Sequence, residues 1–194
     1  MRITGGRARG IPLVCPPGNQ TRPATDQLRE AVFSSLGNWV EDAVVVDLFA
    51  GSGSYGLEAL SRGAHHSSFY ETNSKARQAL SQNLNALARS LLIEVSALGS
   101  VNPLDVFKIT RQAVPSKESS GANLIFVDPP YDCIAASIET LFLGPIDHLA
   151  GDAVRVVFEL PGDLQPEIPG WALIKRLGKN GRDKPGAAIF GRAR

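Results

Sequence analysis

The sequence is poor in the residues that build metal clusters and disulfide frameworks. Among its 194 residues there are only two cysteines, Cys15 and Cys133, which lie far apart and form no CxxC motif. This spacing excludes a zinc cluster and a disulfide framework, and it favours a reducing cytoplasm as the location. The rest of the sequence offers no convincing set of metal ligands, so we expect no metal site.

Long apolar segments are also lacking. No apolar run approaches the roughly 20 residues that a membrane-spanning helix needs, and Met1–Gly6 has no apolar core of the kind found in signal peptides. We therefore expect no association with a membrane. Hydrophobic residues make up 43% of the chain and charged residues 20%, which is typical of a globular protein, and the length suits one ordinary domain.

Net positive charge is small overall but is concentrated at both ends of the chain. The formal net charge is +1, yet residues 1–30 carry a net +3, residues 175–194 a net +6 and the remainder a net −8. Basic ends on an acidic centre are typical of a nucleic-acid binder that makes its contacts through its termini. The alternative is a pair of solvated tails, and charge alone does not decide between the two.

Apolar patterning predicts a chain in which strands and helices alternate. Residues 1–23, rich in Gly, Pro and Arg, are predicted to form a basic arm or small hairpin, and residues 24–194 the main domain. Short apolar runs predict buried strands, and apolar residues at i, i+3 and i+4 predict helices between them. The predicted strands cover 43–50, 67–71, 93–97, 123–127 and 154–159, and the predicted helices 24–37, 55–61, 74–88, 104–111 and 134–143.

This alternation predicts an α/β, doubly wound fold around a mostly parallel, Rossmann-like sheet. Residues 171–175 and 187–190 predict a C-terminal antiparallel hairpin. In such folds ligands bind beyond the carboxyl ends of the strands. The polar motifs described next all follow predicted strands, so we expect them to meet at one edge of the sheet.

A glycine-rich motif follows the first of these strands and reads Asp47-Leu48-Phe49-Ala50-Gly51-Ser52-Gly53-Ser54-Tyr55-Gly56. Its glycines allow backbone N–H groups to approach a ligand at the start of a helix, and they satisfy the dinucleotide pattern GxGxxG. Glu71, 20 residues after Gly51, is placed to bind both hydroxyls of a ribose. However, Asp47 would repel a pyrophosphate, whereas it suits a cationic ligand. The motif therefore favours S-adenosylmethionine over NAD, with a dehydrogenase as the alternative.

A second motif, Asp128-Pro129-Pro130-Tyr131, follows the predicted strand 123–127. The two prolines fix the backbone and remove two N–H donors, so that carbonyl groups and the carboxylate of Asp128 remain as acceptors. Tyr131 offers a ring that can stack on a planar base. The motif is suited to accept two hydrogens from a flat exocyclic NH₂ group. A capped turn is the alternative, and four specific residue types in one place disfavour it.

Together the two motifs resemble those of class I S-adenosylmethionine-dependent amino-methyltransferases. Residues 2–10, 21–30 and 51–63 narrow the resemblance to the bacterial 16S ribosomal RNA guanine-N2 methyltransferase family of the RsmD type. The similarity extends over nearly the whole chain and is weaker at 91–117 and after Pro161. The N-terminal segment distinguishes this family from other enzymes that carry Asp-Pro-Pro-Tyr.

The resemblance implies a substrate, a cofactor and a set of site residues. The substrate would be the exocyclic amine of a guanine in 16S ribosomal RNA, in the assembled or assembling small subunit, and the protein would act in the cytoplasm. Asp128, Pro129, Pro130 and Tyr131 would hold the target amine and stack the flipped base. S-adenosylmethionine would be held by residues that follow three strands, namely Asp47, Phe49, Ala50, Gly51, Ser52, Gly53, Glu71, Thr72 and Asn102.

The sequence departs from the family pattern at the adenine end of this expected cofactor site. Where the family usually has an acidic residue followed by a backbone N–H, this sequence has Asn102 and Pro103, and proline has no N–H. Asp105 is the candidate substitute.

Asp128 is the expected proton acceptor in methyl transfer. A carboxylate can accept from both N1–H and N2–H of guanine, which favours guanine over adenine. An N6-adenine methyltransferase acting on nucleic acid is one alternative, and a non-catalytic RNA-binding assembly factor is another. Contacts to phosphates are expected from four arginines near the N-terminus, Arg7, Arg9, Arg22 and Arg29.

Overall fold

The strands form one sheet in the computed structural model, which describes residues 1–16, 26–110, 121–130, 134–179, 181 and 184–193. The strands are β1 (Val44–Leu48), β2 (His66–Tyr70), β3 (Gly99–Asn102), β4 (Ala122–Val127), β5 (Ala150–Pro161), β6 (Trp171–Gly178) and β7 (Pro185–Arg192). The helices are α1 (Asp26–Leu36), α2 (Ser54–Ser61), α3 (Ser74–Leu91), α4 (Val95–Leu98), α5 (Ile134–Leu141) and α6 (Asp147–Leu149). Short 3-10 turns cover Gly37–Val40 and Val106–Lys108, and a π-helical turn covers Phe142–Ile146.

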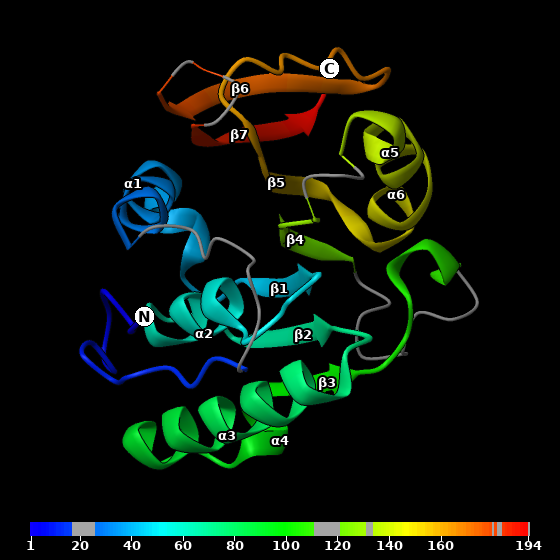
Figure 1. The fold of residues 1–194 in the computed structure, drawn as a ribbon. Coiled ribbons are helices and arrows are strands. Elements are labelled where there is room, and N and C mark those ends of the chain that lie inside the picture. Colours follow the sequence, from blue (N-terminus) through cyan, green and yellow to red (C-terminus); the bar gives the residue numbers. More distant parts are fainter. Residues whose placement is uncertain (17–25, 111–120, 131–133, 180, 182–183, 194) are drawn as a thin grey trace.

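The sheet has the strand order β3-β2-β1-β4-β5-β7-β6 (Figure 1). Strands β1 to β5 pair in parallel, whereas β7 lies between β5 and β6 and is antiparallel to both. The predicted doubly wound, mostly parallel sheet and the C-terminal antiparallel hairpin are therefore confirmed. The order of the strands reverses between β1 and β4, and ligand sites of such folds form outside the carboxyl ends at this point.

Strand β1 is buried on both faces. Val45 packs with apolar residues of α1, α2 and α3, and Val46 packs with those of α5 and the π-helical turn. Figure 1 shows α1 and α2 on one side of the sheet and α5 and α6 on the other. Because helices cover both faces, the carboxyl edge of the central strands is left to present polar side chains. Within the described part of the chain, no helix has both the length and the apolar character needed to cross a membrane.

Two sequence predictions in the middle of the chain are wrong. Residues 93–97 were expected to form a strand, but Val95–Leu98 form the short helix α4, and β3 begins only at Gly99. A Cβ on Gly99 would lie 2.6 Å from the carbonyl oxygen of Ser67, so the close approach to β2 requires glycine there. In place of the helix predicted at 104–111, the described residues 104–110 contain a single 3-10 turn, Val106–Lys108. Asp105 caps this turn, because its Oδ1 accepts the N–H of Phe107 at 3.1 Å.

The first residues of the chain form a small hairpin that packs on α2. The N–H of Ile3 donates to the Ile11 carbonyl at 3.0 Å, and the N–H of Gly10 donates to the Ile3 carbonyl at 2.9 Å. Glu58, buried in α2, accepts hydrogen bonds from the N–H and the hydroxyl of Thr4, at 2.7 and 2.9 Å. The hairpin is therefore part of the folded core, because a buried carboxylate holds it.

A glycine in this hairpin makes the close contact with α2 possible. Gly6 has a φ of +77°, and a Cβ there would lie 2.0 Å from the carbonyl oxygen of Ser61. Ser61 also accepts the N–H of Arg7 through this carbonyl, at 2.7 Å. Two of the three sequence segments that narrowed the family resemblance, 2–10 and 51–63, thus contact each other directly.

Candidate functional site

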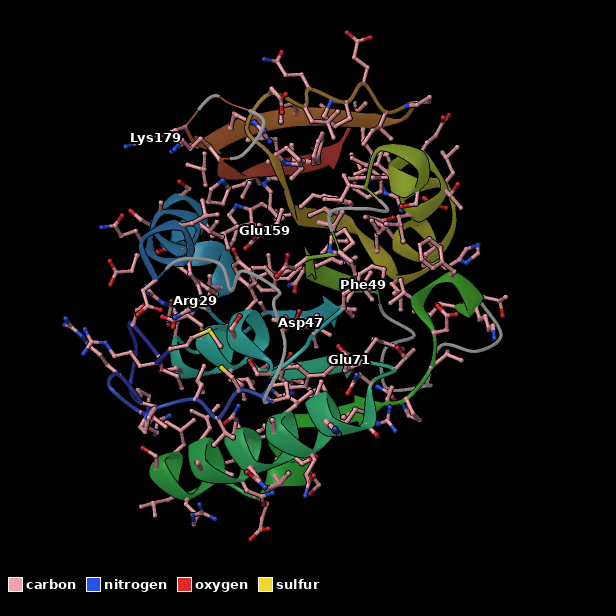
Figure 2. The ribbon with its side chains drawn as sticks, viewed as in Figure 1. Arg29, Asp47, Phe49, Glu71, Glu159 and Lys179 are labelled. Carbon is pink, nitrogen blue, oxygen red and sulfur yellow. The ribbon has the colours of Figure 1, made fainter. Side chains whose placement is uncertain are left out.

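The parallel register brings the polar ends of four strands to one edge of the sheet. Leu48 of β1 pairs with Tyr70 of β2 and with Val127 of β4, and Tyr70 pairs with Asn102 of β3. Asp47 directly precedes Leu48, Glu71 directly follows Tyr70, and Asp128 directly follows Val127. Figure 2 shows Asp47, Phe49 and Glu71 at this edge. The predicted meeting of the motifs is therefore observed.

Asp47 anchors the glycine-rich turn to the helix that follows it. Its side chain is buried, and its Oδ2 accepts the N–H of Gly56 in the first turn of α2 at 2.9 Å. Burial raises the pKa of Asp47 well above its ordinary value; the hydrogen bond from Gly56 lowers it, and the charges of Asp128 and Glu71 raise it further. The carboxyl group thus lies in an acidic, desolvated place that a positively charged ligand would stabilise.

The three glycines of the GxGxxG pattern have different surroundings. A Cβ on Gly53 would lie 2.2 Å from Leu80 Cδ1, and one on Gly56 would lie 2.3 Å from Phe69 Cε1. These two positions allow α2 to pack closely on its neighbours. By contrast, no described atom lies within 4 Å of a Cβ placed on Gly51, whose φ is +55°. Only Gly51, of the three, faces open space.

Glu71 lies against this open glycine. Its Oε2 accepts the N–H of Gly51 at 2.8 Å, and its Oε1 accepts the N–H of Asn73 at 2.7 Å. Two backbone donors therefore fix the carboxylate, while each oxygen keeps a further lone pair for a ligand. The spacing of 20 residues in the sequence predicted this neighbourhood.

A cavity of about 280 Å³ adjoins Glu71. Phe49 is held in the left-handed region, with a φ of +60°, and its ring meets that of Phe107 at a centroid distance of 6.0 Å. The aromatic and apolar walls suit a planar ring, and two carboxylates, those of Glu71 and Asp105, also line the cavity. The lining residues are Phe49, Tyr70, Glu71, Thr72, Leu104, Asp105, Val106 and Phe107.

The segment after β3 contributes to this cavity in a way that the sequence reading partly missed. Asp105 lines the cavity, as expected of the candidate substitute, but Asn102 does not. The carbonyl of Asn102 instead accepts the N–H of Glu71 at 3.1 Å, which ties β3 to β2. Phe107 and Leu104 were not predicted as site residues. An apolar pair flanking an acidic residue directly after a strand is the signal that could have found them.

Asp128 lies one strand away from Asp47. Its N–H is 3.4 Å from the carbonyl oxygen of Leu48, the last residue of β1, so the backbone of β4 continues alongside the glycine-rich motif. Burial raises the pKa of the Asp128 carboxyl to about 7. Pro129 is buried and Pro130 is exposed, and Tyr131 lies outside the described residues.

Two buried polar groups beside Asp128 were not predicted. The hydroxyl of Tyr55 donates to Oε1 of Glu159 at 2.5 Å, and both side chains are 3% exposed. Glu159 belongs to the apolar stretch of β5, and Tyr55 is in the first turn of α2. A lone acid at the end of an apolar strand was the only signal in the sequence.

The four predicted phosphate-binding arginines differ in their exposure. Arg7 and Arg9 are exposed on the N-terminal hairpin, and Arg22 lies outside the described residues. Arg29 is fully buried: its Nη2 donates to the carbonyl of Arg2 at 2.5 Å and to Oδ1 of Asp26 at 2.8 Å. The expectation that Arg29 contacts phosphate is therefore wrong, because its guanidinium joins α1 to the hairpin (Figure 2).

The end of the hairpin reaches the glycine-rich turn. Asn83 of α3 is buried; its Oδ1 accepts the N–H of Val14 at 2.8 Å, and its Nδ2 donates to the carbonyls of Val14 and Ser52 at 3.0 and 2.9 Å. One amide side chain therefore connects the N-terminal segment to the candidate site.

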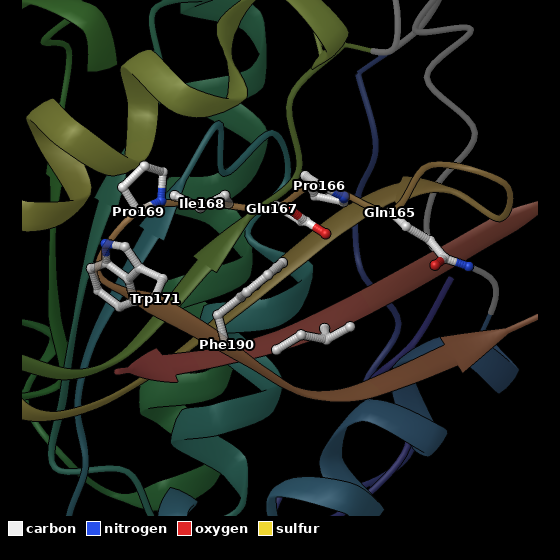
Figure 3. A pocket seen from close by; sticks show the side chains of 8 residues that line it. Gln165, Pro166, Glu167, Ile168, Pro169, Trp171 and Phe190 are labelled. Carbon is white, nitrogen blue, oxygen red and sulfur yellow. The ribbon is translucent and has the colours of Figure 1, made fainter. Parts of the chain in front are cut away.

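A larger cavity of about 680 Å³ lies at the outer end of the sheet, between residues 165–169 and strands β6 and β7 (Figure 3). Its walls include Trp171, Phe190 and one charged side chain, Glu167. Its lining, as far as the described residues define it, contains none of the predicted site residues. The convergence of polar groups favours the smaller cavity as the functional site.

Known proteins resemble this chain over much of its length. Residues 1–181 match a family model described as Conserved hypothetical protein 95. The chain is 37% identical over 131 residues to "Putative rRNA methyltransferase YlbH" of Bacillus subtilis, covering 68% of this chain and 67% of that protein. It is 36% identical over 131 residues to "Ribosomal RNA small subunit methyltransferase D" of Escherichia coli, covering 68% of this chain and 60% of that protein.

Solved structures share the fold across the whole chain. "Putative methyltransferase yhhF" from Escherichia coli superimposes with a TM-score of 0.76 at 27% identity, covering 99% of this chain and 97% of that one. A hypothetical protein of Thermus thermophilus superimposes with a TM-score of 0.73 at 26% identity, covering 100% and 99%.

Proposed function

This chain belongs to the family described as Conserved hypothetical protein 95, and we propose that it transfers a methyl group from S-adenosylmethionine to the exocyclic N2 amine of a guanine in small-subunit ribosomal RNA. Relatives named as ribosomal RNA methyltransferases, which this chain matches over 60 to 67% of their length, support the enzyme class and the kind of RNA. The choice of the guanine N2 amine as the target is supported by the hydrogen-bond acceptors at Asp128 and by the resemblance to the RsmD type.

One observation carries the proposal. A carboxylate that is fixed beside an open glycine and lines an aromatic cavity shares its sheet edge with an Asp-Pro-Pro segment. Glu71 accepts the N–H of Gly51 at 2.8 Å, and Asp128 follows the strand next to the same turn. Glu71 and Asp128 would thus hold the ribose and the target amine at the ends of β2 and β4, on either side of β1, as a methyl transfer between two bound molecules requires.

The residues present fit S-adenosylmethionine. Glu71 would accept the two ribose hydroxyls, and the walls formed by Phe49 and Phe107 would enclose the adenine. Asp105, which lines the cavity, would face the adenine amine in place of Asn102. Asp47 and the turn from Phe49 to Gly53 would lie toward the methionine end, where the acidic surroundings suit a positive charge. When bound, this group supplies a methyl carbon made electrophilic by a positively charged sulfur.

Asp128 and the following proline would prepare the target amine. The lone pair of the guanine N2 is delocalised into the ring, so the nitrogen is a weak nucleophile. The carboxylate of Asp128 and the carbonyl of Pro129 would accept its two N–H bonds and favour a pyramidal nitrogen. As the nitrogen becomes cationic, Asp128 would stabilise the developing charge and take the proton. Tyr131 remains the predicted stacking partner of the flipped base.

The N-terminal hairpin would supply contacts to the RNA backbone. Arg7 and Arg9 are exposed on it, and Asn83 connects its end to the glycine-rich turn. Phosphates bound there would orient the RNA relative to the site, since contacts to the backbone position a nucleic acid without reading its sequence. We further propose that the substrate is the assembled or assembling small subunit, and that the protein works in the cytoplasm.

The test is transfer of radiolabelled methyl from S-adenosylmethionine to small subunits purified from cells that lack this protein, followed by digestion to nucleosides. We expect label in N2-methylguanosine, and a loss of about 100-fold or more in rate for Asp128→Asn. Label in N6-methyladenosine would overturn the assignment of the base. No label on subunits shown to be unmodified would favour the non-catalytic assembly factor.

A further inference from the structure

Asn83 of α3 is a buried amide that none of the steps above uses. The residue is 1% exposed, and it makes hydrogen bonds to two backbone segments that are distant in the sequence. Its partners are the N–H and the carbonyl of Val14 and the carbonyl of Ser52. Both N–H bonds of the amide and one lone pair of its oxygen are therefore used. Since burying an amide is unfavourable unless it is hydrogen-bonded, these three bonds keep it in place.

The backbone of Val14 sets the direction in which this amide points. The N–H of Val14 donates to Oδ1 of Asn83 at 2.8 Å, and its carbonyl accepts from Nδ2 at 3.0 Å. A half-turn of the amide would place Nδ2 against the N–H and Oδ1 against the carbonyl, so that both contacts would become repulsive. Nδ2 therefore remains directed at Ser52, whose carbonyl it meets at 2.9 Å.

The N-terminal hairpin holds Val14 in this position. The N–H of Leu13 donates to the carbonyl of Met1 at 3.1 Å, so the residue before Val14 is paired within the hairpin. The hydroxyl of Ser61, at the end of α2, accepts the N–H of Ala8 at 3.0 Å and fixes the hairpin on that helix. The orientation of the amide is therefore set by the folded hairpin.

Ser52 belongs to the tight turn of the glycine-rich motif. The N–H of Gly53 donates to the carbonyl of Ala50 at 2.7 Å and closes a four-residue turn, in which Gly51 has a φ of +55°. The carbonyl of Ser52 and the N–H of Gly53 belong to one planar peptide and point in opposite directions. Asn83 and Ala50 therefore hold the two ends of this peptide and resist its rotation.

Helix α3 supports the same turn at a second point. Leu80, about one helical turn before Asn83, packs so closely on Gly53 that a Cβ there would lie 2.2 Å from Leu80 Cδ1. By contrast, no described atom lies within 4 Å of a Cβ placed on Gly51. The turn therefore rests on α3 and leaves the side of Gly51 open to a ligand.

We propose that Asn83 is a positioning residue of the cofactor site, which fixes the peptide between Ser52 and Gly53 in the orientation that binds S-adenosylmethionine. This rests on the proposed function. A turn that already has its bound shape loses less conformational entropy on binding than a turn that must first be ordered. Removal of the amide should therefore weaken cofactor binding more than it slows methyl transfer, and the hairpin contributes to cofactor binding through Asn83.

The first test is the affinity for S-adenosylhomocysteine, measured by calorimetry at a temperature at which every variant is folded. Asn83→Ala should raise Kd about 5- to 10-fold, which corresponds to the loss of one hydrogen bond. Asn83→Asp keeps an acceptor for the N–H of Val14 but turns the donor that faces Ser52 into an acceptor, so it should weaken binding at least as much. At saturating S-adenosylmethionine, the rate of methyl transfer should stay within about twofold of wild type in both variants.

Two control variants lie on the same helix. Asn85→Ala makes the same substitution at an exposed asparagine, whose Nδ2 donates to the carbonyl of Ser81, and it should leave Kd unchanged. Leu87→Ala removes a buried apolar side chain about one turn beyond Asn83, so it lowers stability without removing the hydrogen bond to the turn. If Asn83→Ala lowers the melting temperature as Leu87→Ala does but leaves Kd at the wild-type value, the role is merely structural and the proposal is overturned.

A second measurement needs no cofactor. Amide hydrogen exchange followed by NMR reports each backbone N–H separately. In Asn83→Ala we expect the N–H groups of Val14 and Gly53 to exchange about 10-fold faster, whereas that of Ile3, paired within the hairpin, should keep its rate. If the wild type binds no S-adenosylhomocysteine but these two groups lose protection, the proposed function fails while the positioning of the turn stands. If the N–H of Gly53 keeps its wild-type protection, the positioning itself is refuted.

Discussion

The Asp128 carboxyl should cost the protein stability at the pH at which it serves catalysis. Its pKa is about 7 in the folded protein and about 3.9 in an unfolded chain. Between these values the folded state binds more protons than the unfolded state, so the free energy of unfolding falls as the pH rises through this window and levels off above it. Asp128→Asn removes the titrating group while keeping the size of the side chain.

The size of the effect follows from the two pKa values. With these two pKa values and no screening by water, ionisation of Asp128 lowers the free energy of unfolding by roughly 2.5 kcal/mol between pH 5 and pH 8. Asp128 is half-buried, so water screens part of this effect. We therefore expect the free energy of unfolding of Asp128→Asn, relative to that of wild type, to be about 1 kcal/mol higher at pH 8 than at pH 5. In a chain of this length, that is roughly 2 to 4 °C in melting temperature.

Urea unfolding of both proteins at pH 5, 6, 7 and 8, followed by circular dichroism, measures this difference. Asp152→Asn is the control, because it makes the same substitution at an exposed carboxyl. If Asp128→Asn raises the free energy of unfolding equally at pH 5 and pH 8, or lowers it more as the pH rises, the reasoning that desolvation raises the Asp128 pKa is refuted. The same Asn variant should be inactive, so stability rises where function is lost.

Three further predictions concern the hairpin and the cofactor site. Glu58→Ala should destabilise the protein by about 3 to 5 kcal/mol, because it removes the buried carboxylate beside Arg29 and leaves Arg29 with only the more exposed Asp26; urea unfolding measures this, and a cost under 1 kcal/mol would contradict it. Glu71→Ala should weaken binding of S-adenosylhomocysteine about 10-fold or more, measured by calorimetry, and an unchanged affinity would exclude its ribose role. Replacing Arg7 and Arg9 together by Ala should lower the slope of log K against log salt for RNA binding by roughly 1.5. A slope equal to that of wild type would remove the hairpin from the RNA interface.

Local patterns predicted most of the scaffold. Sequence patterns located every strand of the sheet except β3, and the clearest were the central strands β1, β4 and β5, since a strand buried on both faces leaves a continuous apolar signature. The strand predicted at 93–97 failed because the apolar residues near Ile93 belong to the end of α3 and to α4. The true strand β3 contains Gly99, whose lack of a side chain hides it from such a pattern but is needed for its close approach to β2.

The sequence by itself determined the fold class and the residues at the carboxyl ends of the strands, because strand periodicity and glycine-rich turns are local properties of a chain. It also predicted that Glu71 would lie near Gly51. Tertiary structure alone decided that Arg29 is buried and not free for phosphate, since the packing of α1 against the hairpin joins distant segments. The same holds for Glu159 and Asp128: they are 31 positions apart in the chain, and only the register of two parallel strands makes them neighbours.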